Sequence, residues 1–181
     1  MFIEGTSIYL REVRESDVKL ETYYQWMNDS ENTRYLESRF FPQSMESIRK
    51  YVKDAEQNPN IVFLAVILPG PCPDLDKHIG NIKLSIDWKN RFAEVGIIIG
   101  KTHWSQGHGT EALKLIVEYA FGKLNLHKLW AGILRPNIGS LNMFHKAGFV
   151  DEGVLKSQYF TDGGYTDDIM VGIINEKEQK V

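Results

Sequence analysis

Apolar and polar residues alternate along several short stretches of the chain, and this alternation predicts β-strands. In residues 7–13, Ile8 and Leu10 lie on one face, and Tyr9 and Arg11 lie on the other. The run at 60–68 is apolar almost throughout, which is typical of a strand that is covered on both faces. By the same reasoning we expect further strands at residues 78–88, 93–100, 128–134, 150–160 and 165–174.

Helices are predicted where apolar residues recur every three or four positions. The strongest case is 110–124, where an apolar stripe runs through Leu113, Ile116 and Ala120. The chain also has helical patterns and stop signals that predict helices at residues 16–27, 44–57 and 137–147. Gly148 follows the last of these helices, where a left-handed residue ends a helix well.

This order of elements predicts an α/β (α+β) fold with one continuous, mixed and mostly antiparallel sheet of six to seven strands and flanking helices. A single parallel crossover lies in the middle of the chain, between the strands at 93–100 and 128–134. The length of 181 residues suits one domain, 1–181, and we expect its charged tail, 175–181, to fray.

Composition and charge exclude several classes of protein. The net charge of −3, from 21 basic and 24 acidic residues, argues against a dedicated nucleic-acid binder, which needs a basic surplus. One cysteine, Cys72, cannot form an internal disulfide, and no histidine pair has the spacing of a helical metal site, so we expect no metal. The chain has neither an apolar run near the length that spans a bilayer nor a signal-peptide pattern, so we expect a cytoplasmic protein without a membrane partner.

The segment that carries chemistry is a strand end, a turn with Gly107 and Gly109, and a helix start at 110. Unpaired amides of 106–110 and the helix dipole would suit a pyrophosphate. The segment alone is equally compatible with a tight turn that binds nothing. A P-loop is excluded because no lysine follows Gly109, and a dinucleotide fingerprint fits poorly because the segment lies in mid-chain.

Four motifs in this order resemble the GNAT N-acetyltransferases, in particular their ribosomal-protein-N-acetyltransferase-like branch. The resemblance covers nearly the whole chain. It is carried by Leu10-Arg11 with Asp17, by Ile99-Gly100-Lys101-x-x-Trp104-Ser105-Gln106-Gly107-His108-Gly109-Thr110-Glu111-Ala112, by Asn137-Ile138-Gly139-Ser140-Leu141-Asn142-Met143-Phe144-His145-Lys146-Ala147-Gly148-Phe149, and by Gly163-Gly164-Tyr165-Thr166-Asp167.

The resemblance implies a splayed central pair of strands with acetyl-CoA in the gap. The pantetheine arm would bond to the backbone of the strand at 93–100, and the pyrophosphate would lie on the loop amides, which agrees with the physical argument above. The residues expected to bind the cofactor are Ile97, Ile98, Ile99, Ser105, Gln106, Gly107, His108, Gly109, Thr110, Asn137 and Ser140.

The implied reaction is direct attack of a primary amine on the thioester in a ternary complex. Glu94 is the candidate base, because an alkyl ammonium must lose a proton before its nitrogen can attack. A backbone amide near Ile97 or Ile98 would stabilise the oxyanion. The general acid stays open: Phe144 stands where many relatives have tyrosine, so Ser140, Tyr159 or a water could protonate the thiolate, or it leaves unaided.

The acceptor pocket of this family is built from the N-terminal helices and the final hairpin. Here the expected acceptor-binding residues are Trp26, Asn28, Arg34, Tyr35, Glu37 and Tyr165. Aromatic rings and arginines favour a nucleotide-linked amino sugar as the acceptor. The α-amine of a protein N-terminus is the second interpretation and a polyamine the third, since Arg34 and Arg39 disfavour a polycation. A non-catalytic acetyl-CoA-binding module remains an alternative because of Phe144, and the resemblance is compatible with a homodimer.

Overall fold

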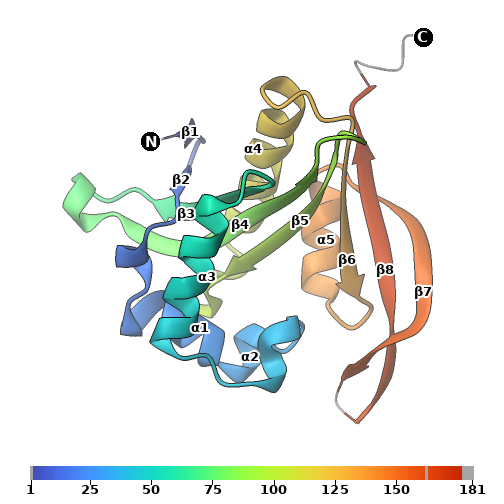
Figure 1. The fold of residues 1–181 in the computed structure, drawn as a ribbon, viewed down its shortest axis with the longest axis horizontal. Helices are drawn as coiled ribbons and strands as arrows, with labels where there is room; N and C mark the ends of the chain where they lie inside the picture. Colours follow the sequence, from blue (N-terminus) through green and yellow to red (C-terminus); the bar gives the residue numbers. More distant parts are fainter. Residues whose placement is uncertain (1, 162, 177–181) are drawn as a thin grey trace.

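The computed structural model describes residues 2–161 and 163–176, which form one sheet of eight strands in the order β1-β2-β3-β4-β5-β6-β8-β7 (Figure 1). All neighbouring strands are antiparallel except β5 and β6, which are parallel. The strands are β1 (Ile3–Glu4), β2 (Tyr9–Glu12), β3 (Ile61–Leu68), β4 (Lys77–Asp87), β5 (Phe92–Ile99), β6 (Lys128–Leu134), β7 (Val150–Thr161) and β8 (Gly164–Ile174).

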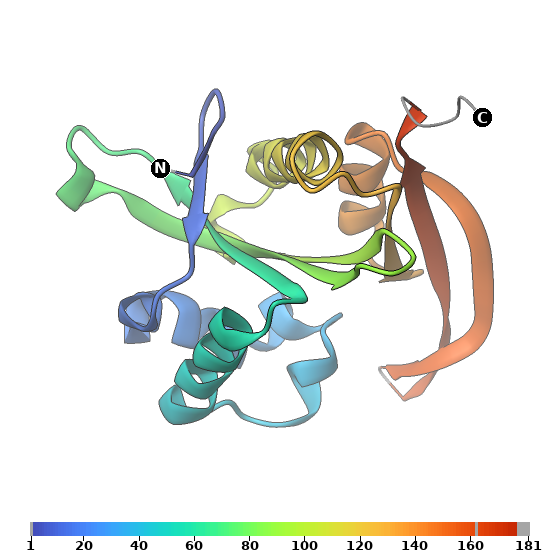
Figure 2. The same ribbon diagram turned by 45° about the horizontal axis from the view of Figure 1, so that its top comes forward.

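Helices cover both faces of the sheet. Figure 2 shows α4 and α5 on one face and α1, α2 and α3 on the other. No helix in the described ranges is long and apolar enough to cross a membrane. The α-helices are α1 (Gln25–Asn28), α2 (Ser30–Thr33), α3 (Met45–Gln57), α4 (His108–Gly122) and α5 (Ile138–Lys146), and the short 3-10 or π-helical turns are η1 (Glu15–Asp17), η2 (Leu20–Tyr24), η3 (Glu37–Phe40), η4 (Pro73–Leu75) and η5 (Lys101–His103).

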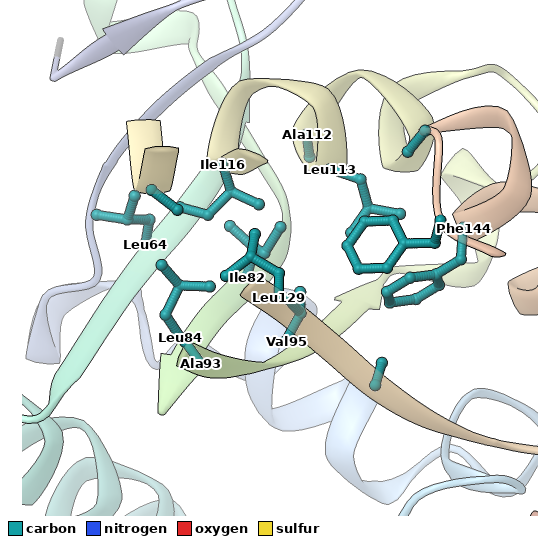
Figure 3. Packing of buried hydrophobic residues seen from close by; sticks show 14 of the residues in the cluster. Leu64, Ile82, Leu84, Ala93, Val95, Ala112, Leu113, Ile116, Leu129 and Phe144 are labelled. Atoms are coloured by element: carbon teal, nitrogen blue, oxygen red, sulfur yellow. The ribbon is translucent and has the colours of Figure 1, made fainter. Parts of the chain in front are cut away.

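The main hydrophobic core lies between the sheet and α4 with α5. Figure 3 shows Ile116 and Leu113 of α4 pointing onto Ile82 and Leu129 of the central strands, and all four side chains are fully buried. The predicted apolar stripe of α4 is therefore its core face. A second, smaller cluster on the opposite face joins α1 and α3 to β3 and contains Trp26.

Most predicted elements are confirmed within a residue or two, including two helix ends. The side chain of Ser44 caps α3 by accepting a hydrogen bond of 3.0 Å from the Ser47 amide. Gly148, which follows α5, has the left-handed φ of +99° that stops a helix.

Two predictions about the N-terminal half are wrong. The sheet has eight strands rather than six or seven, because the chain before Tyr9 turns back and adds the two-residue β1. The single helix expected at 16–27 is broken into η1, η2 and α1. The break follows from Lys19, whose extended backbone (φ −110°, ψ 155°) separates the first two turns, and Asp29 then starts α2 by capping the Asn32 amide.

The C-terminal tail is ordered further than expected. Asn175 is buried, and its amide donates a hydrogen bond of 2.8 Å to the carbonyl of His127. The prediction of fraying therefore fails at Asn175, while residues 177–181 lie outside the described residues.

A fork opens in the middle of the sheet. β5 and β6 pair only from Phe92 to Glu94 with Lys128 to Trp130, although β5 continues to Ile99. Over the rest of its length β6 remains paired with β8, and β5 remains paired with β4. The two strands therefore diverge beyond Glu94, which is the splayed central pair that the sequence analysis expected.

An ion pair fastens the N-terminal segment to β2. Arg11 donates two hydrogen bonds, of 2.7 and 2.8 Å, to the carboxylate of Asp17, and both side chains are largely buried. Burial alone would raise the pKa of Asp17, but hydrogen bonds from Arg11 and from the backbone of Arg14 outweigh burial and lower this pKa. The pair explains the spacing of these residues in the first motif.

We predict that Asp17→Asn lowers the free energy of unfolding by about 2 kcal/mol at neutral pH, because Arg11 then stays buried without its charge partner. A carboxyl with a lowered folded-state pKa stabilises the fold above its unfolded pKa and loses this effect as the pH falls through the folded pKa. The difference between variant and parent should therefore vanish in acid. Urea unfolding measures it, and Asp54→Asn, in the exposed Lys50–Asp54 pair, is a control that should change little. Equal loss at every pH would contradict the ion-pair explanation.

Candidate active site

The fork leads into a cavity of about 630 Å³ that opens between β5, the loop before α4 and the start of α5. Ten of the eleven predicted cofactor residues line it; only Gln106 does not. The lining is Glu31, Asn32, Tyr35, Leu36, Ile97, Ile98, Ile99, His103, Trp104, Ser105, Gly107, His108, Gly109, Thr110, Pro136, Asn137, Ile138, Gly139, Ser140, Asn142, Met143 and Lys146.

The loop presents bare backbone amides to this cavity. Within the described residues, the N–H groups of 106–110 have no hydrogen-bond partner, and they lie at the N-terminus of α4. Gly107 has a left-handed φ of +89°, and a Cβ there would meet no atom within 4 Å. Open donors, the positive end of a helix dipole and empty space together form a site for a diphosphate.

Trp104 secures the strand that leads to this loop. Its indole N–H donates a hydrogen bond of 2.7 Å to the carbonyl of Ile99. That carbonyl, which was expected to bind pantetheine, already has a partner inside the protein. Backbone groups alternate in direction along a strand, so Ile97 shares the open side of β5 with Ile99, whereas the backbone of Ile98 faces β4.

Asn137 and Ser140 meet at the first turn of α5. The side chain of Asn137 caps the helix by accepting a hydrogen bond of 3.3 Å from the Ser140 amide. Both residues line the cavity, and the hydroxyl of Ser140 is a candidate proton donor on this helix. The side chain of Asn137 therefore has a structural bond besides any contact with a ligand.

The ring of Phe144 lies in the core rather than in the cavity. It is 2% exposed and packs edge-on against Phe149, with 5.0 Å between the ring centroids. This residue has no proton to donate and no surface that faces a ligand, so a general acid must come from elsewhere.

The two loop histidines lie side by side, with 6.5 Å between their ring centroids, and both line the cavity. The side chain of His108 is buried. Partial burial, followed by the positive charges of His108 and Lys77, lowers the pKa of His103. A mostly neutral His103 can accept or donate a hydrogen bond to a ligand.

Tyr159 of β7 interacts electrostatically with carboxylates from three other elements. Partial burial raises the pKa of Tyr159, and the negative charges of Asp168, Glu37 and Glu94 raise it further. Glu94 is exposed and lies at the last position where β5 pairs with β6, opposite Trp130. Tyr159 is thus surrounded by carboxylates from β5, β8 and η3, with Arg39 as the opposing cation.

Sequence reasoning missed Asp168. This residue is 4% exposed and lies on β8, opposite Leu134 of β6. Burial raises the pKa of its carboxyl, and the charge of Glu94 adds to this effect. The sequence shows two adjacent aspartates, Asp167 and Asp168, but the polar residues around them predict a solvent-exposed hairpin.

The six predicted acceptor residues are not brought together. Tyr35 lines the cavity, and its hydroxyl donates to the Pro136 carbonyl at 3.3 Å. Trp26 is buried, and its ring packs 5.0 Å from that of His78. The Asn28 amide group is bonded to the Gln43 backbone.

Among the other three, the guanidinium of Arg34 stacks on the ring of Tyr35 at 5.5 Å. Glu37 belongs to the carboxylate group around Tyr159. Tyr165 is 73% exposed and packs on Phe160 near the hairpin tip. No cluster of three or more metal-ligating side chains occurs in the part of the chain that the structure describes.

A forked mixed sheet with an amide-lined loop at its mouth suits an extended ligand that carries a diphosphate. The model of the acetyltransferase (GNAT) domain matches residues 7–150. The chain therefore belongs to the GNAT family, whose acetyl donor is acetyl-CoA, and it is an N-acetyltransferase.

Among its relatives, the probable N-acetyltransferase YjcK of Bacillus subtilis is 34% identical over 107 residues, which cover 58% of this chain and 59% of that protein. The spermidine N(1)-acetyltransferase of Vibrio cholerae is 26% identical over 96% of both chains. The crystal structure of spermidine N-acetyltransferase from Vibrio cholerae in complex with CoA and spermine has the same fold, with a TM-score of 0.82 at 23% identity, over 94% of this chain and 96% of that one.

We predict that Gly107→Ala raises the Kd of CoA at least about tenfold, because a left-handed alanine costs about 1–2 kcal/mol and its methyl occupies the open space above the amides. Titration calorimetry measures this Kd. Gly122→Ala is the matched control: it lies at the other end of α4, its φ is not positive, and its Cβ would meet no atom within 4 Å. Equal affinities for both variants would contradict a diphosphate site at this loop.

Proposed function

We propose that this protein transfers the acetyl group of acetyl-CoA to a primary amine of a small polycation, of the polyamine class. The observation that carries the proposal is the buried, partnerless carboxylate of Asp168 over Gly132 of β6, where the negative charges of Glu94 and Glu37 also act. An acceptor that carries several ammonium groups would be attracted to such a site, whereas an anionic acceptor would be repelled.

The relatives support this acceptor class. Spermidine N(1)-acetyltransferases occur among them, from Vibrio cholerae and from Escherichia coli K12, the latter 33% identical over 52% of this chain and 50% of that protein. This acceptor replaces the amino sugar as our first choice. Arg39 was counted against a polycation, but its guanidinium is engaged by the carbonyls of Leu36 and Phe160 at 2.6 and 2.8 Å.

The residues around the cavity fit acetyl-CoA. The amides of 106–110 would hold its diphosphate, and the unpaired edge of β5 would take the pantetheine arm as an added strand. When bound, acetyl-CoA supplies an activated acetyl thioester. The chain's own residues must then position the amine, remove its proton and stabilise negative charge.

Glu94 accepts the proton of the acceptor ammonium, directly or through a water, in the proposed mechanism. A carboxylate is a weak base for this ammonium, so the step depends on continuous transfer onward to solvent, to which Glu94 is exposed. The backbone N–H near Ile97 donates to the developing oxyanion. The departing thiolate receives a proton from Ser140 or a water, or leaves as the anion.

We predict that Glu94→Gln lowers kcat/KM for the acceptor about 100-fold, because an amide cannot accept the ammonium proton. Release of free CoA thiol measures the rate. Glu118→Gln, an exposed glutamate on α4, is the control and should behave like the parent. Unchanged turnover of Glu94→Gln at every pH would remove this residue from the role of base.

A panel of acceptors tests the substrate class. We expect the highest kcat/KM with spermidine, and much lower values with a nucleotide-linked amino sugar and with a peptide α-amine. A preference for the amino sugar would restore the interpretation that the sequence favoured. Tight CoA binding without thiol release for any amine would contradict the proposed function and would favour a module that binds acetyl-CoA without catalysis.

A further inference from the structure

Asp168 carries a buried carboxylate that lacks a hydrogen-bond partner on one of its oxygen atoms. Its exposed fraction is 4%, and its Oδ1 atom is buried with no hydrogen-bond partner in the part of the chain that the structure describes. A buried carboxylate without partners is costly, so it is expected to persist only where it serves a purpose that offsets this cost. The neighbouring Asp167, in contrast, accepts hydrogen bonds from the Ser157 amide and from Arg135.

The strand arrangement places the side chain of Asp168 on the same face of the sheet as that of Glu94. Val95 of β5 and Ile169 of β8 belong to the core under α4. Because side chains alternate along a strand, Glu94 and Asp168 both point to the opposite face of the sheet. This is the face that carries α1, α2 and η3.

Gly132 of β6 makes room for this carboxylate. A Cβ at Gly132 would lie 2.5 Å from the Oδ2 atom of Asp168, so the aspartate side chain extends over the strand at a position where any other residue would displace it. Trp130, two residues earlier on the same face, is the strand partner of Glu94. The missing side chain at Gly132 therefore allows the carboxylate to reach toward the closed end of the fork.

The charges around Asp168 are mainly negative. Burial raises the pKa of Asp168, and the negative charge of Glu94 raises it further. Tyr159 on β7 and Glu37 on η3 belong to the same group, and Arg39 on η3 is the cation that faces it. Both terminal nitrogens of Arg39 are engaged by backbone carbonyls, so this arginine leaves Asp168 without a direct ion pair.

We propose that Asp168 binds the acceptor's ammonium group beside Glu94 and thereby makes the enzyme select positively charged amines. The ammonium supplies the missing hydrogen-bond donor to Oδ1, and it relieves the repulsion between the two carboxylates. Asp168 stays ionised and holds the nitrogen, while Glu94 takes the proton. This inference rests on the proposed function, because it assigns the acceptor-recognition residue of the same site.

The first test is Asp168→Asn with Asp167→Asn as the matched control. Steady-state kinetics should show a KM for spermidine that rises at least about tenfold in Asp168→Asn, with the KM for acetyl-CoA unchanged. Asp167→Asn should keep the parent's KM for both substrates. A parent enzyme that acetylates spermidine together with an Asp168→Asn variant of unchanged KM would overturn this inference and leave the proposed function standing. A parent that accepts no amine would overturn the proposed function itself.

A second variant leaves Asp168 in place. Gly132→Ala should also raise the KM for spermidine, because the new Cβ displaces the carboxylate. Gly153→Ala on β7 is its control, since a Cβ there meets no atom within 4 Å. If Gly132→Ala binds spermidine as the parent does, Asp168 does not act through the position described here.

Stability gives a readout that does not depend on activity. A carboxyl whose folded-state pKa is raised favours the fold below its unfolded pKa and loses this contribution as the pH rises through the folded value. The melting temperature of Asp168→Asn relative to the parent should therefore increase from about pH 4 to about pH 8. Spermidine, added with CoA, should raise the melting temperature of the parent more than that of the variant. A pH-independent difference, or equal shifts with spermidine, would contradict the inference.

Discussion

The site depends on the point at which two parallel strands stop pairing. β5 and β6 share hydrogen bonds only as far as Glu94 and Trp130, while each keeps its antiparallel partner on the other side. A strand edge that opens inside a sheet leaves backbone donors and acceptors that need a partner. An extended chain with amide groups can take that place, and this is the chemistry of pantetheine. In the proposed function the fork therefore determines both where the acetyl donor lies and which residues meet its thioester end.

Charge is distributed along the fork in a way that matches two substrates of opposite sign. At the mouth, bare amides and the N-terminus of α4 form a positive site. Deeper in the sheet, the buried carboxylate of Asp168 over Gly132, together with the charges of Glu37 and Glu94, makes the surroundings negative. In the proposed function a diphosphate is held at the first and an ammonium at the second, so each substrate is directed to its own site. The cost of this arrangement falls on Asp168, whose buried Oδ1 atom has no hydrogen-bond partner among the described residues and which we propose binds the acceptor's ammonium.

Local sequence patterns were sufficient to predict most of the fold and the turn with two glycines before α4. Alternation placed the strands, and the spacing of Gly107 and Gly109 before an apolar stripe placed the amide-lined turn. The resemblance to the family implied that β5 and β6 diverge, and it suggested the role that we propose for Glu94. Hydrogen bonds set by tertiary contacts could not be predicted in this way. The hydrogen bond from Trp104 to the Ile99 carbonyl is one example. The break in the helix expected at 16–27 was also not predicted.

Asp168 marks the limit of sequence reasoning most clearly. Its burial depends on the absence of a side chain at Gly132 on β6, and its charge environment depends on Glu94 on β5. These residues are distant in sequence and adjacent only in the folded sheet. Read locally, an aspartate beside another aspartate near a glycine turn indicates a solvated hairpin. Only Asp167 fits that description, with its bonds to Ser157 and Arg135.

A crystal structure with CoA and spermidine tests the central claim most directly. The account predicts that the pantetheine arm lies along β5 beyond Glu94, that the diphosphate lies on the amides of 106–110, and that a terminal nitrogen of spermidine lies within hydrogen-bonding distance of Asp168. CoA bound outside the fork, or a complex in which β5 and β6 pair along their whole length, would contradict it.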